Sequence, residues 1–143
     1  MLIEVGPVPS RSVRAWVGYA RTVIEQRRAH DAETLPEEIR REFERYLDAW
    51  ERAAGRDDPV RWSAEVDPAV VEYLVHGFYR VATRLAEESE RPGARRAPVE
   101  GRAFYRALVD ALLDALVAQG GSVAQFASEL RPFWPWLTDD DPT

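Results

Sequence analysis

Four long stretches of this sequence repeat apolar residues every three or four positions, and proline or glycine residues separate the stretches. That spacing places the apolar side chains on one stripe of an α-helix, and such a stripe must be buried against another element. The clearest stripe runs from Ile39 through Phe43 and Leu47 to Trp50. The sequence therefore predicts a protein built from packed amphipathic helices.

Capping residues, prolines and glycines set the limits of these helices. The expected ranges are about 10–30, 34–55, 67–89 and 99–119. Thr34-Leu35-Pro36-Glu37 has the form of a capping box with proline in the first turn, and Gly55 is expected to end that helix in a left-handed C-cap. Gly120 and Gly121 stop the fourth helix, and Ser122 caps a short fifth one. The helical part of the fold is therefore well defined.

The remaining segments give weaker signals. Residues 1–9, which hold two prolines, and the tail 138–143 are expected to be irregular or frayed, and 56–66 is expected to be a loop. Nothing alternates with a two-residue period for long enough to propose a sheet. Short connections favour antiparallel neighbours. We therefore predict one all-α domain over 1–143: an up-and-down four-helix bundle with a short fifth C-terminal helix and an aromatic capping tail.

Composition excludes several kinds of chemistry. The chain has no Cys, so disulfides, thiolate catalysis and Cys-based zinc sites are impossible. All 19 basic residues are Arg, which excludes Schiff-base lysines and the phosphate-loop lysine. The net charge of -6 disfavours a nucleic-acid partner. No apolar run reaches the ~18 residues of a membrane span, and no secretory signal is apparent, so we expect a cytoplasmic protein without a membrane partner.

Two pairs of side chains are candidates for reactive or metal-binding groups. Glu72 and His76 stand four residues apart, as two metal ligands on one helix would, but they lie off its apolar stripe. Asp110 and Asp114 could divide acid and base roles if burial separated their pKa values, but the stripe places them on a polar face. We therefore predict no metal, no cofactor and no catalytic residue.

Positive charge gathers around the linker between the third and fourth helices. Four arginines there could bind a phosphate or another anion, because guanidinium groups match its geometry. The alternative is that these arginines are simply solvated and that nearby glutamates neutralise their charge. The candidate anion-binding residues are Arg91, Arg95, Arg96 and Arg102.

Two features suggest a contact surface. The apolar residues of the fourth helix spread beyond one stripe, which indicates either a central position in the bundle or a second contact surface. The segment 133–136 holds two tryptophans, which are common at interaction hot spots, although such a segment can also close its own bundle. The candidate partner-binding residues are Leu113, Val117, Trp134 and Trp136.

These features favour a non-enzymatic helical-bundle interaction or adaptor module that binds a protein partner or forms a homodimer. The alternative is a sensor or carrier that binds an apolar small molecule between its helices. The candidate ligand-pocket residues in that alternative are Trp16, Trp50, Phe78, Phe104 and Tyr105.

Overall fold

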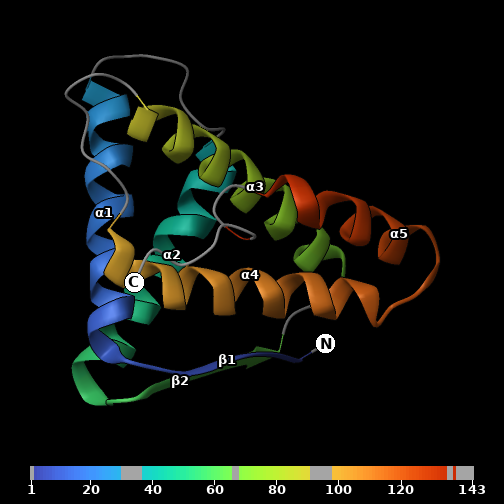
Figure 1. Cartoon of the computed structure of the whole chain (residues 1–143), viewed down its shortest axis with the longest axis horizontal. Coiled ribbons are helices and arrows are strands. Elements are labelled where there is room, and N and C mark those ends of the chain that lie inside the picture. The colour runs from blue at the N-terminus through green and yellow to red at the C-terminus, as the bar shows by residue number, and fades with distance from the viewer. Residues whose placement is uncertain (1, 30–36, 66–67, 91–97, 135–136, 138–143) are drawn as a thin grey trace.

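The computed structural model describes residues 2–29, 37–65, 68–90, 98–134 and 137. Within these ranges it contains five α-helices, two short 3-10 helices and one two-stranded antiparallel sheet (Figure 1). The helices are α1 (Ser10–Ala29), α2 (Glu37–Arg56), α3 (Pro68–Glu90), η1 (Val99–Gly101), α4 (Arg102–Val117), α5 (Gly121–Leu130) and η2 (Arg131–Phe133). The strands are β1 (Leu2–Val8) and β2 (Val60–Glu65).

The prediction of an all-α four-helix bundle was wrong. The fold is mixed α/β, because β1 and β2 pair with each other and the sheet packs against α4. The helices also do not run side by side in an up-and-down arrangement. In Figure 1, α1 runs across one end of α4, while α3 and α5 lie on the opposite side of α4 from the sheet.

Both strands form because their side chains alternate between two environments. Ile3 and Val5 of β1 are buried. Leu2, which precedes Ile3, and Glu4, which lies between the two buried residues, are exposed. β2 alternates in the same way from Val60 to Glu65, and the pairing register aligns inward residues with inward residues. The segments 1–9 and 56–66 were predicted to be irregular because each alternation is short and prolines interrupt the first.

Gly6 is required where the two strands come closest. Its φ of +107° lies in the region that favours glycine, and a β-carbon there would stand 2.3 Å from the carbonyl oxygen of Val60. The register of the sheet shifts between Val5 and Val8, around this glycine. Gly6 therefore sets the local path of β1.

The helix ranges agree with the sequence prediction to within a few residues. Gly120 and Gly121 have φ values of 75° and 67°, which confirms the stop after α4. Gly55 was predicted to end α2 in a left-handed conformation, but α2 continues through it to Arg56 and Gly55 has no positive φ. The capping box at Thr34 lies outside the described residues.

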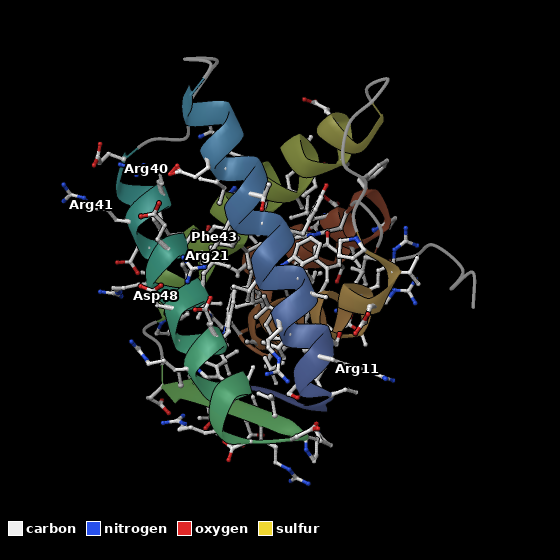
Figure 2. The ribbon with its side chains drawn as sticks, turned by 90° about the vertical axis from the view of Figure 1, so that its left-hand side faces the viewer. Arg11, Arg21, Arg40, Arg41, Phe43 and Asp48 are labelled. Carbon is white, nitrogen blue, oxygen red and sulfur yellow. The ribbon has the colours of Figure 1, made fainter. Side chains whose placement is uncertain are left out.

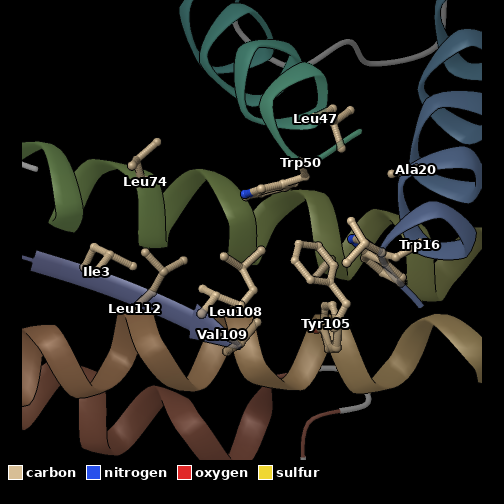
Figure 3. Packing of buried hydrophobic residues seen from close by; sticks show 14 of the residues in the cluster. Ile3, Trp16, Ala20, Leu47, Trp50, Leu74, Tyr105, Leu108, Val109 and Leu112 are labelled. Carbon is tan, nitrogen blue, oxygen red and sulfur yellow. The ribbon is translucent and has the colours of Figure 1, made fainter. Parts of the chain in front are cut away.

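α4 forms the centre of the core (Figure 3). β1, α1, α3 and α5 all contact it. In Figure 3, Ile3 of β1 lies beside Leu112 of α4, and Trp16 of α1 lies beside Tyr105. Of the apolar residues that spread beyond one stripe, Val109 and Leu113 are buried in this core, whereas Val117 is 42% exposed. The buried residues of α4 are Phe104, Tyr105, Leu108, Val109, Leu112, Leu113 and Leu116.

Two small residues join α1 to the start of α4. A β-carbon on Gly101 would stand 3.0 Å from the backbone nitrogen of Trp16, so glycine allows η1 to approach α1 closely. The buried hydroxyl of Ser12 accepts a hydrogen bond of 3.0 Å from the backbone N–H of Phe104. This bond satisfies one of the free N–H groups in the first turn of α4.

Candidate interaction surface

The inner face of the sheet is more fully covered at β1 than at β2. Ile3 and Val5 of β1 are 1% and 4% exposed, because α4 packs on this strand. The residues opposite them on β2, Ala64 and Trp62, are only half-buried although they face inward. The side of the sheet at β2 is therefore the more open one. Among the described residues no third strand pairs with the far edge of either strand, and β2 is the strand whose inward side chains stay half-buried.

Two large aromatic rings lie along this open side. The indole of Trp62 meets the ring of Tyr46 edge-on at 5.6 Å and that of Trp50 at 5.8 Å. Trp50 is buried, but Trp62 and Tyr46 remain half-buried. Burial raises the pKa of the Tyr46 hydroxyl, the carboxylate of Glu42 raises it further, and Arg45 opposes them. Beside β2 there is consequently apolar surface that its own chain covers only in part.

The outer face of β2 carries a row of polar side chains. Arg61, Ser63 and Glu65 are all exposed and point to this face, so the row reads positive, neutral, negative. Within the described ranges Arg61 has no ion-pair partner. An open hollow lies on the same face of the sheet, and its lining residues are Glu4, Val5, Gly6, Arg61, Trp62 and Ser63.

The residues predicted to bind a partner do not form one surface. Leu113 is fully buried in the core and Trp134 is 2% exposed, with its ring edge-on to Tyr79 at 5.3 Å. Val117 at the end of α4 is 42% exposed. Trp136 lies outside the described residues. Leu113 and Trp134 thus pack within the chain itself.

The rings predicted to line a ligand pocket pack on one another. Trp50 meets Phe104 edge-on with 5.1 Å between ring centroids, and Trp16 lies 4.6 Å from Tyr105. All four are buried. The side chain of Phe78 lies outside the part of the chain that the structure describes.

The candidate acid–base groups make surface contacts. The exposed ring of His76 stacks on Phe126 at 4.7 Å. Asp110 and Asp114 both pair with Arg131, the latter at 2.9 Å, which ties η2 to α4. Across the ranges that are described, no three His, Asp or Glu side chains gather as a metal-ligand set.

The structure describes only one of the four arginines that are predicted to bind an anion. Arg91, Arg95 and Arg96 lie outside the described residues. Arg102 begins α4 and is half-buried, and its Nε is buried without a hydrogen-bond partner among the residues described. The anion site formed by these four guanidinium groups therefore stays a prediction.

Another arginine links α1 to α2 (Figure 2). Arg21 donates to Asp48 at 2.6 Å and to Glu51 at 3.2 Å. Burial lowers the pKa of Arg21, but the hydrogen bond to Asp48 and the charges of Glu51 and Asp48 outweigh it and raise the pKa overall. Because this pair of contacts is largely exposed, it contributes little to stability and points to no ligand.

The residues of β2 that form this surface were not predicted from the sequence. Trp62, Arg61, Ser63 and Glu65 all fall in the segment predicted to be a loop. The alternation of apolar and polar residues from Val60 to Glu65 is the signal that could have identified them.

Compared with models of known protein families, with curated proteins and with solved structures, the chain matches none of them. Among the described helices, none is both long and apolar enough to cross a lipid bilayer.

Proposed function

We propose that this protein is a self-associating protein-interaction module, and that the open side of its sheet is the contact surface. The observation that carries the proposal is the position of Trp62, an inward-facing residue of β2 that stays half-buried at an unpaired strand edge. A sheet edge offers a row of backbone N–H and C=O groups to another strand.

The composition of the open side also supports binding. Trp and Tyr side chains are enriched at interaction hot spots because they bury large areas at a small cost in conformational entropy. Trp62 and Tyr46 supply two such rings on the inner side of β2, and the outer face of the same strand carries an exposed row of hydrogen-bonding and charged side chains.

Size-exclusion chromatography with light scattering tests the proposal over ~5 µM to ~500 µM protein. The expected mass is twice the 16.3 kDa of one chain at the upper end of this range. A mass of one chain at every concentration would overturn self-association.

A further inference from the structure

We propose that two copies of this chain pair antiparallel along β2, with Ser63 of one copy opposite Ser63 of the other. The product is a continuous four-stranded sheet in the order β1–β2–β2–β1. This inference rests on the proposed function, because it names the partner and the register of the same open edge. Three features of β2 carry it: its open edge, its two distinct faces and its charge order.

The two faces of β2 restrict the registers that are allowed. Opposite residues of an antiparallel pair point to the same face, and a slip of one residue exchanges the faces of one strand. Such a slip would place the inward Trp62 of one copy on the charged face of the other. The pair must therefore align inward rows with inward rows, as β1 and β2 already do.

The charges select one register among those that remain. Pairing centred on Arg61 sets two guanidinium groups opposite each other, and pairing centred on Glu65 sets two carboxylates opposite each other. Pairing centred on Trp62 or on Ala64 avoids this repulsion, but it sets Arg61 or Glu65, respectively, opposite the neutral Ser63. Pairing centred on Ser63 places Arg61 of each copy directly opposite Glu65 of the other, where their β-carbons lie roughly 4.5–5.5 Å apart. The exposed row of β2 is thus self-complementary for a second copy of this chain.

The inward row fits the same register. Trp62 of each copy lies opposite Ala64 of the other, so a large side chain meets a small one. The half-buried indole of Trp62 is then further covered by the second copy. The two-fold axis stands perpendicular to the sheet, so the helices of both copies lie on the same side of it.

Edge strands also carry charged residues simply to prevent such pairing. Charges that guide the pairing of two copies and charges that prevent it predict different results when the charges are reversed. Arg61→Glu and Glu65→Arg each turn two attractive pairs into two repulsive ones, and we expect either change to weaken the dimer by about tenfold or more. The double variant Arg61→Glu/Glu65→Arg restores opposite charges at both positions, so its dimer should approach that of the wild type. Light scattering with sedimentation equilibrium measures all four proteins.

A cysteine cross-link tests the register directly. The chain has no cysteine, so Ser63→Cys introduces a single thiol. The two α-carbons at this position would lie roughly 4.5–5.5 Å apart, within the span of a disulfide. Mild oxidation should then convert Ser63→Cys to a covalent dimer. Glu4→Cys is the matched control, because Glu4 is exposed on the same face opposite Ser63, but the two copies of it would be about 14 Å apart.

The outcomes separate this inference from the function on which it rests. A wild-type dimer that all charge variants retain, or that cross-links equally well through Glu4→Cys, would overturn the β2 register while self-association stands. A wild type that remains monomeric would overturn both. Loss of the dimer in both single variants and its return in the double variant would establish the pairing.

Discussion

At Gly6, the backbone of β1 approaches β2 so closely that a β-carbon would stand 2.3 Å from the carbonyl oxygen of Val60. The obstacle is backbone, which cannot rotate away as the end of a side chain could. The φ of +107° adds a conformational cost for any L-residue with a side chain. One residue thus determines whether the two strands can pair as they do.

Gly6→Ala should lower the free energy of unfolding by about 3 kcal/mol, since both the contact and the backbone conformation oppose the new methyl group. Gly18→Ala is the matched control. Gly18 lies inside α1 and a β-carbon there meets nothing within 4 Å, so alanine should stabilise the protein by up to about 1 kcal/mol. Urea denaturation of both variants measures the difference. Equal stability of the two would contradict the close approach of the strands.

At the scale of single elements, β1 supplies one apolar row to α4 and leaves the other row in solvent. Ile3→Ala removes a side chain that is 1% exposed, and we expect a loss of about 3 kcal/mol in the free energy of unfolding. Leu2→Ala, at the neighbouring and 52% exposed position, should cost less than about 0.5 kcal/mol. Both are compared at one protein concentration, because self-association would itself add stability. A large loss in Leu2→Ala would mean that the outer face of β1 is covered.

The helices were predictable and the strands were not, for physical reasons. A stripe repeated along the length of α2 gives a strong periodic signal, so its range was predicted closely. β1 offers only three inward residues, with Gly6 and a proline between the second and the third. Its pairing with β2 depends on a contact between distant parts of the chain, which local patterns do not encode. The candidate surface was missed with the strands that form it.

The fourth helix shows the same limit. Its sequence predicts a wide apolar surface, which fits either a central position in the core or a contact surface for a partner. Leu113 is fully buried, because β1 and the neighbouring helices cover α4 on several sides. The hydroxyl of Ser12 in α1 likewise accepts a hydrogen bond from the first turn of α4. The burial of Leu113 and the hydrogen bond of Ser12 both depend on which elements pack together, and local sequence patterns do not encode this.

In the whole molecule, α4 is enclosed by the sheet on one side and by α3 and α5 on the other (Figure 1). The chain after α5 turns back through η2, where Arg131 pairs with Asp110 and Asp114 of α4. This turn brings Trp134 against Tyr79 of α3 and buries it. The end of η2 therefore helps to close the core, in addition to the contacts made by the long helices.

Trp134→Ala should accordingly lower the free energy of unfolding by about 4 kcal/mol, because it empties the space of a ring that is 2% exposed. Phe133→Ala is the matched control, since its neighbouring ring is 74% exposed and should cost less than about 0.5 kcal/mol. Trp134→Phe should cost under about 2 kcal/mol, because the indole Nε1 has no hydrogen-bond partner among the described residues and only ring volume is lost. Urea denaturation of the three variants measures these losses, and light scattering should find the same oligomeric mass in each, because neither residue belongs to β2. A dimer that fails in Phe133→Ala while stability is unchanged would instead place the contact surface at this end of the molecule.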